Sequence, residues 1–125
     1  MVRILTIPHH WQEYETVGNW KFGRNGGLLV LVSDMQNEKY EFLIGLHEMI
    51  EAYLCKKANI KESDVTAFDI EFEKNRPEGN VDEPGNDPKA PYYHQHLFAT
   101  EVERALAKAL SVDWNIYDKF VNEFN

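Results

Sequence analysis

One stretch decides the fold of this chain: Gly45-Leu46-His47-Glu48-Met49-Ile50-Glu51-Ala52-Tyr53-Leu54-Cys55. Its apolar residues recur with the spacing of one face of an amphipathic helix. On such a helix His47 and Glu51 share a face, and Glu48 lies about 100° around the axis. An imidazole beside a carboxylate on an apolar face needs a partner. A metal ion is one candidate, because neutral imidazole and carboxylate oxygen are ordinary zinc ligands.

The helix around this stretch is predicted to run from Glu38 to Ala58. Asn37 and the acidic residues after it are typical of a helix start, and Asn59 is expected to end the helix. Cys55 is interpreted as a small core residue rather than a ligand or nucleophile. The apolar face is assigned to Phe42, Leu43, Leu46, Ile50, Tyr53 and Leu54.

The segment His47-Glu48-Met49-Ile50-Glu51 resembles the His-Glu-x-x-His helix of the zincin metallopeptidases, with Glu51 in place of the second histidine. The resemblance implies that His47 and Glu51 bind zinc and that Glu48 is the general base that activates a water molecule. The chain as a whole also resembles small proteins of phage or prophage type, and this second resemblance implies no particular activity.

A third metal ligand is expected from the second half of the chain, where the segment from Tyr92 to about Leu110 predicts a helix. One face of that helix carries His96, Ala99, Glu103, Leu106 and Leu110. His96 is therefore the leading candidate for the third ligand. Glu103 is expected either to accept a hydrogen bond from a ligand histidine or to coordinate the metal itself. His94, which should point roughly opposite to His96, and His10 remain alternatives.

Together His47, Glu51 and His96 provide two histidines and one carboxylate, the donor set of several catalytic zinc sites, with a fourth position left for water. The same set suits ferrous iron. The sequence therefore predicts a zinc-dependent hydrolase, with a peptidase as the first expectation and a peptide or small molecule as substrate. The alternative is a non-catalytic acidic interaction protein of phage type that binds a host protein and holds a structural metal or a buried polar cluster.

Three strands are predicted before the motif helix, at Val2–Ile7, Tyr14–Phe22 and Leu28–Val32. Arg24-Asn25-Gly26-Gly27 is a strong turn signal between the last two. We expect an α+β fold in which a small antiparallel sheet of about three N-terminal strands packs on the motif helix. Two or three further helices should follow, in a layout similar to a minimal zincin.

The first of these further helices is expected at Asp64–Glu73, with Ser63 as its cap and a solvated acidic face. The last should start at an Asp113 cap. Between them, Arg76–Pro91 holds four of the five prolines of the chain and shows no periodicity. Such a loop in a small domain is either flexible or a binding lid, and it could border a cleft over the metal.

Composition limits the remaining function classes. The 125 residues are 43% hydrophobic, so we expect a single domain over residues 1–125. The formal net charge of -8 argues against nucleic-acid binding through phosphate contacts. No apolar stretch or signal-peptide region predicts a membrane span or export. The single cysteine cannot form an internal disulfide, and we expect a cytoplasmic protein.

Overall fold

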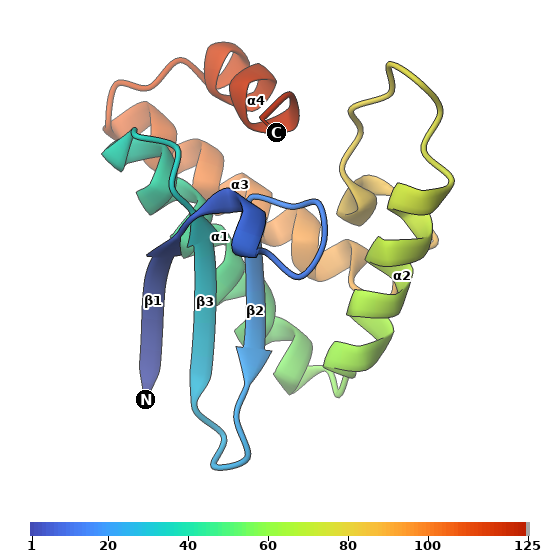
Figure 1. Cartoon of the computed structure of the whole chain (residues 1–125). Helices are drawn as coiled ribbons and strands as arrows, with labels where there is room; N and C mark the ends of the chain where they lie inside the picture. Colours follow the sequence, from blue (N-terminus) through green and yellow to red (C-terminus); the bar gives the residue numbers. More distant parts are fainter. Residues whose placement is uncertain (125) are drawn as a thin grey trace.

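The structure, a computed structural model, describes residues 1–124, which form a three-stranded sheet followed by four α-helices. The elements in chain order are β1 (Val2–Ile7), η1 (His9–Trp11), β2 (Gly18–Phe22), β3 (Leu28–Ser33), α1 (Glu38–Lys57), α2 (Glu62–Lys74), η2 (Pro84–Asn86), α3 (Tyr93–Ala109) and α4 (Trp114–Asn122). The predicted α+β class is confirmed (Figure 1).

The sheet has the order β1-β3-β2 and is mixed rather than antiparallel. β2 and β3 form the expected antiparallel hairpin, but β1 pairs with β3 in parallel. The prediction of an antiparallel sheet is therefore wrong for one of the two pairs. The reason is that residues 8–17 cross the end of the sheet and leave β1 and β2 on opposite sides of β3 (Figure 1). The most apolar strand thus takes the centre, where Val30 and Val32 are fully buried.

The second predicted strand was too long. Residues 14–17 lie outside any strand, and β2 begins only at Gly18. Thr16 makes this turn, because its hydroxyl donates to the carbonyl oxygen of Gly18 at 2.8 Å and also faces the Gly18 N–H at 3.3 Å. The turn brings Tyr14 away from the sheet and toward α2, where it joins the site described below.

Helix α1 follows the prediction closely. The Asn37 side chain accepts a hydrogen bond from the Tyr40 N–H, and Asn59 has the left-handed φ of 58° that ends many helices. The predicted apolar face is wrong in part, because Phe42 and Tyr53 are each 56% exposed. The buried face instead consists of Leu43, Ile44, Gly45, His47, Glu48, Glu51, Ala52 and Cys55.

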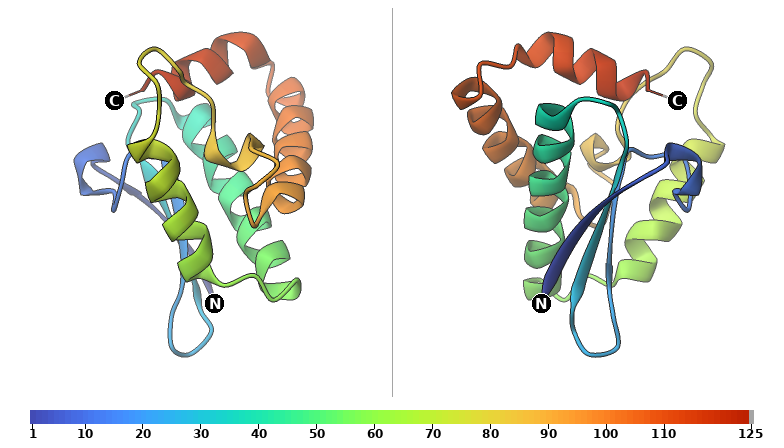
Figure 2. Two further views of the ribbon diagram at one scale, coloured as in Figure 1. Left: turned by 90° about the vertical axis from the view of Figure 1, so that its right-hand side faces the viewer. Right: turned by 60° about the vertical axis from the view of Figure 1, so that its left-hand side comes forward.

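The polar residues of α1 are buried because the helix is covered on two sides. It packs against β2 and β3 on one side and against α3 on the other (Figure 2). At Gly45 the sheet comes very near, since a Cβ atom there would lie 3.3 Å from Ile4 Cγ2. Side chains between the two packed layers are enclosed whether they are apolar or charged.

The other helices surround this centre. α2 lies beside β2, and the Glu62 carboxylate accepts the Phe22 N–H at 2.7 Å. The N-cap of α2 is Lys61, so the predicted Ser63 cap is wrong by two residues. The Asp113 cap of α4 is confirmed, because its carboxylate accepts the Ile116 N–H.

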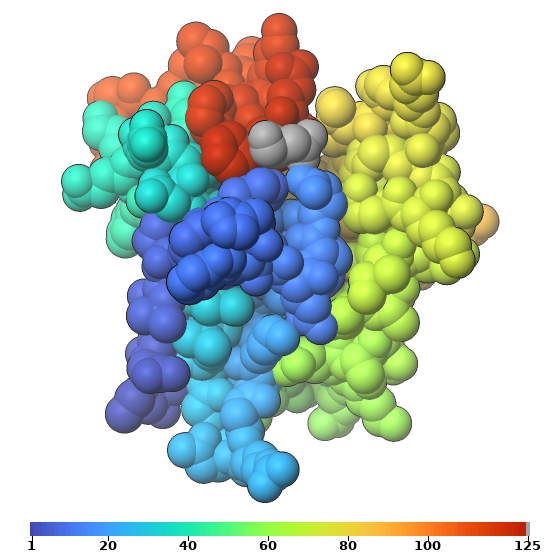
Figure 3. Space-filling view, viewed as in Figure 1, coloured from blue at the N-terminus to red at the C-terminus, as the bar shows by residue number. Residues whose placement is uncertain are grey.

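The predicted loop contains one short helical turn, η2, and is braced by hydrogen bonds. Arg76 donates hydrogen bonds to both carboxylate oxygens of Glu73 and to the backbone carbonyls of Asn80 and Asp82. The loop, drawn in yellow, stands beside α4 in the space-filling view (Figure 3). Within residues 1–124, no helix has the length and apolarity needed to cross a membrane.

Candidate metal centre

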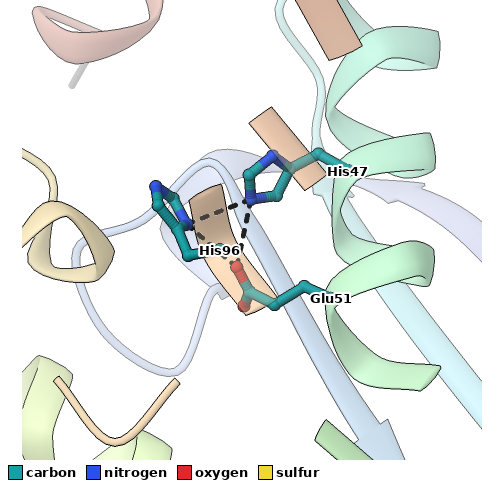
Figure 4. Close-up of side chains that lie close together, drawn as sticks. All are labelled: His47, Glu51 and His96. Atoms are coloured by element: carbon teal, nitrogen blue, oxygen red, sulfur yellow. Dashed lines mark hydrogen bonds and ion pairs between the residues drawn. The ribbon is translucent and has the colours of Figure 1, made fainter. Parts of the chain in front are cut away.

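Three side chains from two helices meet at one point. His47 and Glu51 come from successive turns of α1, and His96 reaches them from α3 (Figure 4). The Glu51 Oε2 atom lies 3.1 Å from His47 Nε2 and 3.0 Å from His96 Nδ1, and the two nitrogens are 3.2 Å apart. Each residue is at most 6% exposed. The structure thus brings together the three residues that the sequence singled out as ligands.

The geometry and chemistry of this triangle fit a metal ion. Ligand atoms around tetrahedral zinc, at bond lengths of about 2.0–2.1 Å, are separated by about 3.3 Å. The three distances here are 3.0–3.2 Å, so little movement would be needed. This buried group of two histidines and one carboxylate could hold a metal ion.

A second layer of hydrogen bonds fixes two of the three side chains. His47 Nδ1 lies 2.7 Å from Glu103 Oε1, and the Tyr117 hydroxyl donates to the other oxygen of Glu103 at 2.5 Å. The Trp20 indole N–H donates to Glu51 Oε1 at 3.0 Å. Outer partners of this kind orient metal ligands in proteins. The sequence left two roles open for Glu103, a hydrogen bond to a histidine of the cluster or direct coordination of a metal. In the structure Glu103 makes the hydrogen bond, to His47.

The protonation preferences show that the cluster stabilises positive charge. Burial alone would lower the pKa of His47, but hydrogen bonds to Glu103 and Glu51 outweigh it and hold the pKa well above its usual value. Burial would likewise raise the pKa of Glu51, yet the hydrogen bonds to His47 and His96 lower it to about 2. The Glu51 carboxylate therefore stays ionised, and a positive charge beside it, a proton or a metal cation, would be stabilised.

Glu48 is buried next to the triangle. Its Oε2 atom lies 3.9 Å from His47 Nε2. Burial and the charge of Glu51 raise the pKa of Glu48 well above its usual value. The side chain is confined by β2, since a Cβ atom on Gly18 would come within 2.8 Å of Glu48 Cγ. The predicted general base therefore lies beside the predicted ligands in a fixed position.

The triangle opens into a cavity of about 240 Å³ that reaches the loop and α4. Among the described residues its lining holds one arginine, Arg76, and no lysine. It holds the carboxylates Glu15, Glu48, Glu51, Asp69, Glu73, Asp82, Glu83, Glu103 and Asp118. The loop thus borders the cavity, as the sequence suggested. Such a lining favours a cation over an anion.

Several residues of the cavity wall were missed from the sequence, among them Tyr14, Asp69 and Tyr92. Asp69 of α2 is buried and accepts hydrogen bonds from the hydroxyls of Tyr14, at 2.7 Å, and Tyr92, at 2.5 Å. Burial raises the pKa of Asp69 to about 6, although both tyrosines act in the opposite direction. The predicted solvated face of α2 is therefore wrong at Asp69. The position of Tyr92 could have been predicted, because a residue four positions before His96 lies on the same side of the helix start.

The other candidates for the third ligand lie elsewhere. His94 and His10 are exposed, and neither belongs to the cluster. Cys55 is fully buried in the apolar core, as interpreted. Trp20 and Tyr117, which support the cluster, gave no sequence signal, because their partners are distant in the chain.

Comparisons with protein-family models, curated proteins and solved structures found no match to this chain.

Proposed function

We propose that this protein is a zinc-dependent hydrolase of zincin-like design, in which His47, Glu51 and His96 bind the metal and Glu48 is the general base. The observation that best supports the proposal is the convergence of three ligand atoms within 3.2 Å of one another, beside the buried carboxyl group of Glu48. The order of ligand, base and ligand along α1 is that of the zincin motif helix.

The residues divide the chemistry between them. Three protein ligands leave a fourth position for water or substrate, and bound zinc lowers the pKa of such a water to about 7. Glu48 lines the same cavity and would accept the proton of such a water. A cation held by His47, Glu51 and His96 would offset the effect of burial and would favour the ionised form of Glu48. Glu103 and Trp20 hold His47 and Glu51 in the orientation that binding needs.

The cavity lining narrows the substrate class. A wall rich in carboxylates repels phosphate esters, so we propose a neutral or cationic carbonyl substrate, an amide or an ester. An extended peptide would need free N–H groups on an edge strand. On β2, alternate N–H groups are already bonded to the side chains of Thr16, Asn19 and Glu62. A small molecule or the end of a peptide chain fits this site better than an internal peptide segment.

The second candidate is a non-catalytic interaction protein whose cluster is structural, whether or not it holds a metal. The observation that favours it is the deep burial of the three ligands, each at most 6% exposed. Structural zinc sites are closed by four protein ligands, whereas catalytic sites keep one position open. The two candidates therefore differ in whether water or a small ligand reaches the metal.

The test is hydrolysis by the full chain loaded with zinc, assayed on a panel of amide, ester and phosphate-ester substrates. We expect turnover of an amide or ester that stops in chelator and returns when zinc is restored. Iron should be offered in parallel, because the donor set also suits ferrous iron. A protein that holds one zinc but hydrolyses nothing on the panel, and whose metal does not bind a small inhibitor such as a hydroxamate, would favour the structural alternative.

A further inference from the structure

One ring nitrogen of His96 lacks the hydrogen bond that the outer atoms of His47 and Glu51 have. His96 Nε2 is buried and has no hydrogen-bond partner among the described residues. The other ring nitrogen of His96 faces the triangle, whereas His47 and Glu51 each have a second partner on their outer side. A buried polar atom without a partner costs free energy, so it points to an interaction that completes the site.

The loop between α2 and α3 lies directly against this atom. Glu83 Oε1 is 3.7 Å from His96 Nε2, just beyond hydrogen-bond distance. Two residues later, Gly85 packs on the face of the imidazole so closely that a Cβ atom would lie 2.4 Å from His96 Cγ. The hydrogen bonds of Arg76 to the carbonyls of Asn80 and Asp82 hold the approach to Glu83 in place.

The ring nitrogen of His96 that carries the proton determines which kind of partner can complete the site. A neutral imidazole that binds a metal through Nδ1 carries its proton on Nε2, which must then find an acceptor. In most protein metal sites that acceptor is a carboxylate, a carbonyl or water. Glu83 is the carboxyl group next to Nε2, at 3.7 Å, and a shorter separation would give it the relation to His96 that Glu103 has to His47 at 2.7 Å.

We propose that Glu83 is a positioning residue that accepts the His96 Nε2 proton when the metal is bound, so that metal binding ties the loop to the site. The inference rests on the proposed metal site. The movement needed is about 1 Å, from the observed separation to a charge-assisted hydrogen bond. Because the loop also lines the cavity, this bond links the metal to the wall that faces the substrate.

The experiment measures zinc affinity of the full chain and of three variants. Glu83→Ala should weaken binding by about 10- to 100-fold, the usual effect of losing such a partner. Glu83→Gln keeps an acceptor oxygen and should stay within a few-fold of the unchanged protein. Glu78→Ala removes the same charge from an exposed position of the same loop and should have no effect. Cobalt in place of zinc should show an altered absorption spectrum only in Glu83→Ala.

A second readout follows the loop itself. Zinc should slow amide hydrogen exchange at residues 80–86 in the unchanged chain and not in Glu83→Ala. If zinc binds equally well to Glu83→Ala and protects the loop equally, the inference is overturned and the metal site stands. If Glu83→Gln binds zinc as weakly as Glu83→Ala, the negative charge of Glu83 rather than its hydrogen bond supports zinc binding. That result also overturns the inference. If the unchanged chain binds no metal, the proposed function fails as well.

Discussion

Replacing Glu48 with glutamine should abolish hydrolysis while leaving the metal in place. Glutamine has the shape of glutamate, so the packing against Gly18 is kept. It cannot accept the proton of the attacking water, and general bases contribute about 10²- to 10⁴-fold to rate. We expect a loss of that size in kcat/KM, with zinc content and thermal unfolding close to those of the unchanged chain.

A matched control for this change is Glu101→Gln, which alters an exposed glutamate of α3 and should leave activity unchanged. Loss of zinc from Glu48→Gln would show that Glu48 is itself a ligand and would contradict its assignment as base. Full activity in Glu48→Gln would show that another group takes the proton.

His96→Ala should weaken zinc binding by at least about 100-fold, more than the usual loss of an outer partner. The change removes the one ligand that α3 supplies and leaves Glu51 without the hydrogen bond at 3.0 Å. Alanine keeps the helix, so the effect should be local to the site. Affinity is best measured by competition with a chromophoric chelator, with circular dichroism as the check on folding.

The control for this change is His94→Ala, because His94 lies on the same helix and is exposed. Its zinc affinity should be unchanged. Equal affinities for the two variants would remove His96 from the site. In that case the ligand set would have to be completed by another group of the cavity wall, such as Glu48.

Much of α1 and α3 could be predicted because their signals are local. Asn37 and Asn59 mark the ends of α1 through their own backbone and side-chain chemistry, and the four-residue spacing of His47 and Glu51 places both on one face. The same reasoning placed His96 and Glu103 on one face of α3, where both are buried.

The features that were missed depend on contacts between distant parts of the chain. The parallel pairing of β1 with β3 follows from the path of residues 8–17, which periodicity does not report. Phe42 and Tyr53 fit an apolar stripe, yet the packing of α3 on α1 buries the polar stripe instead.

The outer partners of the site were equally hidden from the sequence. Asp69 looked like one of several surface acids on α2 until Tyr14 and Tyr92 were placed against it. Glu83 lies in a segment without periodicity, and only the folded loop brings it to His96. Sequence spacing thus predicted the residues that lie on one helix face, whereas their partners on other elements required the structure.

The most direct test of the metal site is elemental analysis of the full chain, purified without a metal-binding tag, beside His47→Ala. We predict about one zinc per chain in the unchanged protein and almost none in His47→Ala, since that residue supplies one corner of the triangle. No stoichiometric metal in the unchanged protein, even after zinc is offered, would contradict the account and leave His47, Glu51 and His96 as a buried polar cluster.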